Sequence, residues 1–444
     1  MKLKKTSLAI ALIFGATLQA SAQIGPNLTP WGAEAGANKD GSIPAYTGGI
    51  KNGPKIPASG IMPNPFPEDK VLYTIDASNM AKYLDKLTPG TQALMKKYPG
   101  FKLSVYPTRR SVNYPQHVLD NTAKNMTRCG LLDNGDALDV SKGCARGIPF
   151  PVPKNGYEAM WNHNGRYYGP GRISMPSESS YIKANGERVV TSIAYSYNDN
   201  GLYHFDGDLP KRHWSIRVEY TGPARIVGQG TVIYDEFDGA RKSYSYQPAT
   251  RRVRLAPDLA ADTPIGTAGG ATTYDEMNMF SGTMDRWDMK LVGKKDIYIP
   301  YHVYDWGQKP GCTKPDELFG PGHPKMECVR FELHRVWHVQ ATLKPGKRHI
   351  YGMRDYYYDE DGWYGGAQEQ WDKEGKMYRM QYVGLMPNWE KQVPLGGEFS
   401  VSFDLNSGVY FASKAMGTYI LDKPLAASII GPERLSTPVL TAPK

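Results

Sequence analysis

The chain has 444 residues, and its 53 Lys and Arg against 44 Asp and Glu give a formal net charge of +9. The 30 Tyr, 12 Phe and 9 Trp can build a hydrophobic core, which excludes a long disordered chain. Only one apolar run approaches the length of a membrane helix, so a multi-pass membrane protein is excluded as well. The 47 Gly and 34 Pro favour many short strands and turns over a helical bundle.

Residues 1–22 have the layout of a secretory signal peptide. Lys2, Lys4 and Lys5 form a basic start, an apolar run covers 8–18, and small residues end the segment at Ala22. The run is too short to span a bilayer and no stop-transfer pattern follows, which disfavours a permanent membrane anchor. We expect cleavage near Ala22 and a soluble periplasmic protein. Loss of the three lysines leaves a net charge of +6, which favours transient contact with anionic membrane surfaces.

Residues 23–70 predict an extended arm. Prolines recur along the segment, and each removes a backbone donor and restricts the residue before it. Trp31, Ile43, Tyr46 and Ile56 make the segment too apolar for a flexible linker. We therefore expect the arm to lie across a single β-rich domain formed by residues 71–444.

Two short helices are expected at the start of that domain. The first covers 76–87 and the second 90–98, where Thr88 and Pro89 supply an N-cap and a first-turn proline. Residues 101–185 are expected to form mostly turns and short extended pieces. The apolar face predicted for the first helix consists of Met80, Tyr83, Leu84 and Leu87.

From about residue 186 the apolar residues recur at period two, which predicts strands. A hairpin is expected from 189–197 and 202–205, followed by strands at 214–220, 231–237, 241–247 and 251–256. A long antiparallel meander is expected from 332–344, 349–359, 363–371 and 377–383. The predicted fold class is mainly β, with a large curved antiparallel sheet or half-open β-barrel and covering helices near 76–98.

Four cysteines, Cys129, Cys144, Cys312 and Cys328, lie in the mature chain. An even count in an exported protein favours disulfides, and four cysteines allow three pairings. We predict Cys129–Cys144 and Cys312–Cys328, because each pair closes a compact loop that would contribute about 3 kcal/mol. The spacing lacks the tight C-x₂₋₄-C pattern of a zinc site.

Signatures of catalysis are mostly missing from the sequence. It has no G-x-S-x-G elbow, no H-E-x-x-H helix and no phosphate-binding loop, so we predict a protein that is not an enzyme and holds no metal or cofactor. His334 and His338 lie about 13 Å apart along a strand, which suggests structural or surface roles. Asp359 to Asp361 are expected to form an exposed polar turn.

The alternative is an enzyme that acts on envelope lipid or glycan. Its acid and base groups would come from Asp285, Asp359 and Asp361 with His334 or His349, provided that these side chains converge in one cleft.

Basic residues cluster at Arg251, Arg252 and Arg254. On a strand, Arg252 and Arg254 share a face, where they would contact a lipid head group or an acidic partner. A solvated edge with ion pairs is the alternative. Nucleic-acid binding is excluded, because it needs a stronger basic stripe and does not suit an exported chain.

Aromatic and apolar residues alternate along the predicted meander. A sheet with such faces must be covered by helices or by a ligand, so the choice lies between a closed core and a partly open barrel that holds an apolar molecule. The residues predicted to line such a cavity are Trp337, Val339, Tyr356, Tyr358, Tyr378, Met380, Tyr382 and Phe403.

Several separated stretches resemble one bacterial family. They are residues 28–34, 41–49 (GSIPAYTGG), 147–153, 158–163, 251–257 (RRVRLAP), 280–287 (FSGTMDRW), 299–301, 334–337 and 348–363. Together they resemble the exported proteins of a domain-of-unknown-function family that is often labelled outer-membrane lipoprotein-sorting-like. The resemblance covers essentially the whole mature chain.

That family is similar to the periplasmic lipoprotein carrier and outer-membrane acceptor of the Lol system, which have a half-open barrel with a helical lid over an apolar cavity. The resemblance implies a periplasmic carrier or transfer protein for a hydrophobic, lipid-like molecule. Members are commonly encoded beside RND-type exporters and outer-membrane barrel proteins, which implies both as partners. A structural adaptor of such an exporter, with a filled barrel, is the alternative.

Overall fold

The computed structural model describes residues 24–257, 259, 261–414 and 417–439. The predicted signal peptide and its cleavage site lie outside these ranges. Within them, no helix combines the length and the apolar character needed to cross a membrane.

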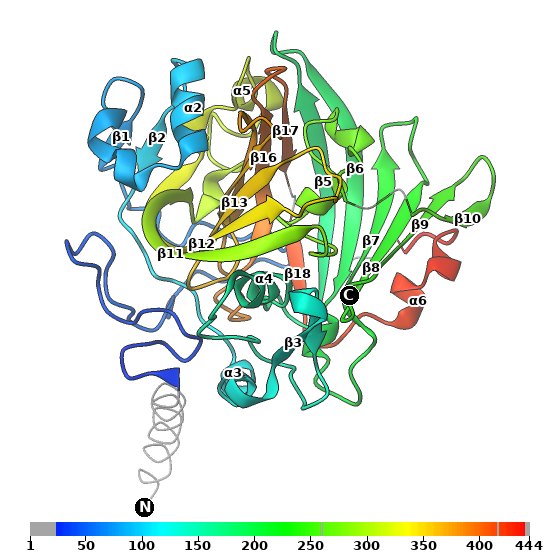
Figure 1. Ribbon diagram of the computed structural model, residues 1–444. Coiled ribbons are helices and arrows are strands. Elements are labelled where there is room, and N and C mark those ends of the chain that lie inside the picture. The colour runs from blue at the N-terminus through cyan, green and yellow to red at the C-terminus, as the bar shows by residue number, and fades with distance from the viewer. Residues whose placement is uncertain (1–23, 258, 260, 415–416, 440–444) are drawn as a thin grey trace, which may run out of the picture.

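The architecture is mainly β, as predicted, and is dominated by one large sheet whose two ends do not pair with each other (Figure 1). Its strands, in spatial order, are β1 (Tyr73–Ile75), β2 (Leu103–Val105), β12 (Arg330–Leu343), β13 (Met353–Asp359), β14 (Gly366–Trp371), β15 (Met377–Leu385), β16 (Gly396–Asp404), β17 (Tyr410–Lys414), β5 (Gly171–Ile182), β6 (Arg188–Asp199), β7 (Arg212–Gly222), β8 (Gly230–Glu236), β9 (Arg241–Gln247) and β10 (Arg252–Leu255). Off this path, β11 (Trp287–Pro300) pairs with β12 and β18 (Thr418–Leu421) pairs with β5. Neighbouring strands are antiparallel except β2 and β12. The strands β3 (Gly130–Leu132) and β4 (Ala137–Asp139) form a separate hairpin.

Helices are few and short. The α-helices are α2 (Pro89–Lys97), α3 (Gln116–Arg128), α4 (Gly156–Asn164), α5 (Pro315–Leu318) and α6 (Ala427–Ile430). The 3₁₀ elements are η1 (Met80–Lys86), which is longer than one turn, and the single turns η2 (Asp133–Gly135), η3 (Gly201–Tyr203), η4 (Gly266–Ala268), η5 (Tyr274–Glu276), η6 (Val303–Asp305), η7 (Met326–Cys328) and η8 (Pro432–Arg434). The start of α2 is as predicted, since Thr88 caps it by accepting a hydrogen bond from the Thr91 amide.

The prediction of an α-helix over 76–87 is wrong. The segment forms the 3₁₀ element η1, which is broken at Tyr83 by a non-helical φ of −130°, and Leu84 is exposed. Asp76 accepts hydrogen bonds from the Ser78 amide and hydroxyl, and Asn79 accepts one from the Asp76 amide. These local bonds compete with helix formation at its first turn.

Residues 101–185 contain more regular structure than predicted. They form the helices α3 and α4, the short strands β2, β3 and β4, and the whole of the long strand β5. The helix α3 buries Val118, Leu119, Thr122 and Ala123. Because Thr122 is polar and Ala123 is small, the buried face of this helix is not recognisable as an apolar pattern in the sequence. In β5, serines on both faces hide the period-two alternation.

The predicted hairpin of 189–197 with 202–205 is also wrong. The strand β6 pairs with β5 and β7, while η3 folds Leu202 and Tyr203 into the core. In contrast, the four strands predicted for the meander correspond to β12 to β15, with ends shifted by a few residues.

Side chains on the central strands alternate between two covered faces. One face, here called the α4 face, carries the cross-strand row Tyr356, Gln368, Gln381 and Ser402. The helix α4 covers this face, where the His163 ring stacks on Tyr358 at 4.2 Å.

The opposite face, here called the α2 face, carries the cross-strand row Tyr357, Ala367, Tyr382 and Val401. The helix α2 covers it, and the hydroxyls of Thr91 and Tyr382 lie 2.5 Å apart. The strand β11 curves around this side, as Figure 1 shows, and the residue after it, Tyr301, bridges Leu385 at the end of β15.

The N-terminal arm packs against the body as predicted from its apolar residues. Trp31 is buried between the rings of Tyr46 and Tyr114. Gly32 has a φ of +93°, and a Cβ atom there would collide with the backbone carbonyl of Pro151. The arm therefore fits closely against the domain, although the division at residue 70 stays a prediction.

Both predicted disulfides are present, Cys129–Cys144 and Cys312–Cys328. The first joins the end of α3 to the loop before Ala145, and the second ties the segment 312–328 just before β12.

Candidate functional site

The predicted lining residues divide between the two faces of the sheet. Trp337, Val339, Tyr356 and Tyr358 lie on the α4 face, whereas Met380, Tyr382 and Phe403 lie on the α2 face. Apart from the partly buried Tyr378, all are buried within one hydrophobic core. They cannot line a single cavity together, and a ligand reaches either group only if the covering segments move.

A cavity of about 250 Å³ lies on the α4 face instead. It sits between β5 to β7 on one side and β15 to β17 on the other, and residues 265–278 form part of its wall. The polar lining residues are Ser174, Ser177, Ser196, Asn198, Thr272, Asn278, Tyr364, Gln381, Ser400 and Ser413, the charged ones Arg172 and Glu276, and the apolar ones Ile216, Ile265, Met277, Val383 and Phe411.

A ladder of amide side chains leads into this cavity. The Gln368 amide donates to the carbonyl oxygen of Gln381, and the Gln381 amide donates to the hydroxyls of Ser400 at 3.2 Å and Ser402 at 2.9 Å. This ladder satisfies buried polar groups that would otherwise destabilise the sheet, and it fixes the Gln381 side chain at the cavity wall.

Two buried donors at the cavity lack a partner among the described residues. Arg172 donates through one terminal nitrogen to the Gly396 carbonyl at 3.2 Å, but its Nε is unpartnered. The side-chain nitrogen of Asn198 is also unpartnered. The only charged lining residue besides Arg172 is Glu276, which already bonds Tyr351, Thr272 and Thr273. The cavity therefore offers a cation and an amide donor to a guest.

Asp359, Glu360 and Asp361 are not the exposed turn that the sequence predicted, because each is at most 2% exposed. The arm and the segment before α3 cover this hairpin end. The Arg110 guanidinium donates to both carboxylate oxygens of Asp361, at 2.9 and 2.7 Å. The composition of the turn predicted exposure, because the residues that bury it lie some 250 positions away in the chain.

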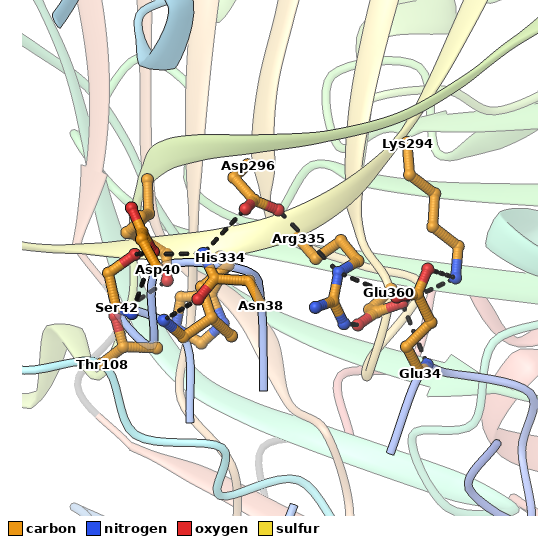
Figure 2. Close-up of polar contacts among 12 residues, drawn as sticks. Glu34, Asn38, Asp40, Ser42, Thr108, Lys294, Asp296, His334, Arg335 and Glu360 are labelled. Atoms are coloured by element: carbon orange, nitrogen blue, oxygen red, sulfur yellow. Dashed lines mark hydrogen bonds and ion pairs between the residues drawn. The ribbon is translucent and has the colours of Figure 1, made fainter. Parts of the chain in front are cut away.

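Glu360 occupies the centre of an ionic cluster that joins the arm to β11 and β12. Figure 2 shows Lys294, Arg335 and Glu34 around it, and its oxygens lie 2.9 Å from Lys294 Nζ and 2.8 Å from Arg335. Lys294 also bonds Glu34 of the arm at 2.9 Å. The cluster holds the arm in place and is enclosed by it.

The ionisation of neighbouring carboxyls differs strongly. Burial, together with the charges of Asp361 and Glu360, raises the pKa of Asp359 well above its usual value. Burial acts in the same direction on Asp361, but Arg110 outweighs it and lowers the pKa of Asp361. A protonated Asp359 beside an ionised Asp361 avoids two negative charges next to each other in a buried site.

The acid and base groups of the predicted enzyme do not form one site. His334 lies 3.5 Å from Asp359 within the buried cluster. Asp285, however, pairs with Lys347, and His349 bonds Asp275, in another part of the molecule. Of the proposed groups, Asp359, Asp361 and His334 therefore lie together at the buried hairpin end, whereas Asp285 and His349 lie elsewhere.

His334 and His338 have separate partners, as structural histidines do. His334 bonds Glu332 at 3.1 Å, and His338 bonds Asp355 at 2.8 Å.

The basic cluster lies on the last strand of the sheet, β10. Arg252 and Arg254 are exposed there, and Arg251 just before them is exposed as well. One edge of β10 pairs with β9, and the arginines leave the strand strongly cationic. Their role in binding a head group or partner stays a prediction.

The cavity residues Arg172, Ser174, Ser196 and Asn198 were not among the predicted site residues. The segment 171–182 lies within residues 101–185, which were expected to form mostly turns and short extended pieces. The signal that could have indicated the cavity was the serine-rich run itself. Buried serine hydroxyls on a strand need hydrogen-bond partners, which are polar side chains, water or a ligand.

Comparisons with known proteins identify close relatives in sequence. The model of a family described as a protein of unknown function, DUF1329, matches residues 74–423. An uncharacterized protein of Pseudomonas aeruginosa is 36% identical over 412 residues, which cover 91% of this chain and 89% of that protein.

Three solved structures are similar at low sequence identity. A candidate outer membrane lipoprotein-sorting protein domain from Vibrio parahaemolyticus has a TM-score of 0.44 at 11% identity and covers 63% of this chain and 98% of its own. A DUF1329 family protein from Desulfovibrio piger has a TM-score of 0.44 at 12% identity, with coverage of 63% and 97%. A LolA superfamily protein from Nitrosomonas europaea has a TM-score of 0.37 at 8% identity, with coverage of 63% and 98%.

Proposed function

The chain belongs to the DUF1329 family, and we propose that it is a periplasmic carrier for an amphiphilic molecule with an apolar body and an anionic head. The observation that carries this proposal is the pair of unpartnered buried donors, on Arg172 and Asn198, at a cavity with apolar side chains in its wall. An anionic head group satisfies both donors, and its bond to Arg172 is charge-assisted.

The energetics favour an amphiphile over a purely apolar guest. A buried donor without a partner costs about 1–3 kcal/mol, and a hydrocarbon leaves that cost in place. Ile216, Val383 and Phe411 add favourable contact for an alkyl group, at about 0.8 kcal/mol per buried CH₂. The anionic head group therefore distinguishes the ligand from a hydrocarbon, and the alkyl group of the ligand adds affinity.

The size of the cavity limits what it holds as it stands. Its 250 Å³ lies just below the roughly 300–1,000 Å³ of typical ligand pockets, which suits a head group with a short chain. A longer chain has to continue along the α4 face toward Tyr356 and Tyr358. Phe280 lies 6.0 Å from Tyr356 there, so the segment that carries it must move.

The periplasmic location is part of the proposal. The signal-peptide layout and the two disulfides support it, because disulfides persist in oxidising compartments. The resemblance stated above adds an RND-type exporter and an outer-membrane protein as proposed partners. The exposed arginines of β10 are the surface we assign to contact with an acidic partner or an anionic membrane.

A titration with sodium decanoate tests the proposal. Delipidated protein is titrated by calorimetry with decanoate and, separately, with decanol, which has the same chain without the charge. We expect decanoate to bind more tightly. Arg172→Gln is expected to weaken decanoate binding about 10- to 100-fold, because it removes a charged hydrogen bond.

The matched control is Arg348→Gln, which removes the same charge from an exposed position between β12 and β13 and is expected to leave binding unchanged. The proposal is wrong if decanoate does not bind, or if the wild type and Arg172→Gln bind it equally.

A further inference from the structure

A serine, a histidine and a glutamate are hydrogen-bonded in series at the base of the arm. Ser111 Oγ lies 2.5 Å from His302 Nε2, and His302 Nδ1 lies 2.6 Å from Glu332 Oε1. The three side chains belong to segments that are far apart in the sequence. Their order is that of a nucleophile, a general base and a carboxylate that orients the base.

The backbone and its neighbours hold His302 rigidly in this position. His302 follows β11 and has a φ of +50°, a left-handed conformation that is uncommon for a residue other than glycine. Its amide donates to the Leu385 carbonyl, and the Phe66 ring packs edge-on against the imidazole at 4.9 Å. Unusual backbone geometry of this kind concentrates at functional sites.

Glu332 is held by further donors besides His302. They are Arg330 Nε at 2.5 Å, the Arg109 amide at 2.8 Å and His334 Nε2 at 3.1 Å. Burial raises the pKa of Glu332, but the charge of Arg330 and the hydrogen bonds from His302 and His334 outweigh it and hold the pKa well below its usual range. The carboxylate is ionised, so it accepts the Nδ1–H of His302 and leaves the Nε2 lone pair facing Ser111.

The imidazole is neutral, as a general base must be at rest. Burial lowers the pKa of His302, with opposition from Glu332 and further lowering by Arg330 and His334. The hydroxyl of Ser111 therefore donates to a neutral nitrogen that can take its proton.

A groove of about 500 Å³ reaches Ser111. The arm forms one wall, through residues 44–52 and 65–66, and residues 108–111 form the other. Among the described residues, its lining includes the cations Lys51, Arg109 and Arg110 and no carboxylate. Arg109 pairs with Asp69 and Arg110 with Asp361, which leaves Lys51 as the cation at the groove without an ion pair in the described chain.

We propose that Ser111 is the nucleophile of a second functional site, a serine esterase that cleaves carboxylic esters bound in this groove. Ser111 Oγ bonds to the ester carbonyl carbon while its proton passes to His302 Nε2, and Glu332 stabilises the imidazolium. The carbon–oxygen bond to the alcohol then breaks, and the alcohol leaves with the proton from His302.

Water completes the reaction. It gives a proton to His302 as its oxygen bonds to the acyl carbon, and the acid is released as the proton returns to Ser111 Oγ. No oxidant or metal enters these steps. The unpaired charge of Lys51 in the wall of the groove favours an ester that carries an anionic group.

A fluorophosphonate probe tests the proposal directly, since it forms a stable adduct only with an activated serine. The mature protein is incubated with the probe, digested and mapped by mass spectrometry, and hydrolysis of 4-nitrophenyl butyrate is followed in parallel. We expect the adduct on Ser111 and a reaction rate that rises with pH and reaches half of its maximum below pH 6.5, as the lowered pKa of His302 requires.

Ser111→Ala is expected to abolish the adduct and to lower hydrolysis about 1,000-fold. Ser59→Ala changes an exposed serine of the arm and is expected to leave both readouts unchanged. A thermal melt verifies that each variant is folded. The proposal is overturned if folded wild-type protein carries no adduct on Ser111, or if folded Ser111→Ala hydrolyses the ester at the wild-type rate.

Discussion

Replacement of Glu369 by Gln should stabilise the protein at alkaline pH. Glu369 lies on the α2 face of β14, where it is fully buried and accepts a hydrogen bond from the Gly90 amide at 2.5 Å. Its other carboxylate oxygen has no partner among the described residues. Burial raises the pKa of Glu369 to about 8, although bonds from Thr88 and Gly90 act against it.

The sign of the effect follows from the raised pKa. Glu369 holds its proton in the folded state up to about pH 8, whereas the unfolded chain releases it near pH 4.5. Stability from this group is therefore fully present below pH 4.5 and is lost progressively as the pH rises toward 8. The slope reaches about 1.36 kcal/mol per pH unit between the two pKa values and is smaller near each of them, so the loss between pH 5 and pH 8 is roughly 3.5 kcal/mol.

Glu369→Gln keeps an oxygen for the Gly90 amide but does not ionise. Urea unfolding at pH 5, 6.5 and 8 should show the variant gaining roughly 3.5 kcal/mol on the wild type across this range. Glu374→Gln, at the exposed turn between β14 and β15, is the matched control and should follow the wild type. If the gap between Glu369→Gln and the wild type does not change with pH, the reasoning about this buried carboxyl is wrong.

Two further predictions concern the arm and a disulfide. Arg110→Ala leaves the carboxylate of Asp361 buried without its guanidinium partner, so we expect a loss of about 3–5 kcal/mol in thermal unfolding and faster proteolysis of the arm. An unchanged melting temperature would show that the cluster does not hold the arm. Replacement of Cys312 and Cys328 by Ser opens a loop with a sequence separation of 16 and should cost about 3 kcal/mol in urea unfolding. Equal stability of this variant and the oxidised wild type would contradict that estimate.

The parts of the fold that were predictable from sequence depend on local patterns. The strands β12 to β15 follow one another in the chain, and each pairs with the next. Their period-two pattern therefore predicts both the strands and their order in the sheet. The two disulfides also close short loops. In β5, by contrast, Ser174 to Ser180 remove the apolar alternation. Of its three partner strands only β6 is near in the chain, and β17 and β18 come more than 200 residues later.

The candidate site could not be located in the same way. The cavity collects Arg172 and Asn198 from one half of the sheet, Gln381 and Phe411 from the other, and Met277 from a covering loop. No short motif links residues with such separations, and only the completed sheet brings them together.

The hydrogen-bonded series of Ser111, His302 and Glu332 was not predictable from the sequence for the same reason. It has no nucleophile elbow, and its members meet only because β2 pairs in parallel with β12 and β11 pairs with the same strand. Aromatic residues were the more visible signal in the sequence, but in the structure Tyr356 and Tyr382 mainly fill the core on opposite faces.

The most direct test of carriage is to identify what the protein holds when it leaves the cell. The mature protein is purified from the periplasm without detergent and analysed by native mass spectrometry, followed by organic extraction of the bound material. The proposed function predicts a co-purifying amphiphile with an acidic head group, which Arg172→Gln loses and Arg348→Gln retains. Protein with only its polypeptide mass, or the same bound material in the wild type and in Arg172→Gln, would contradict the assignment of the cavity as the carrier site.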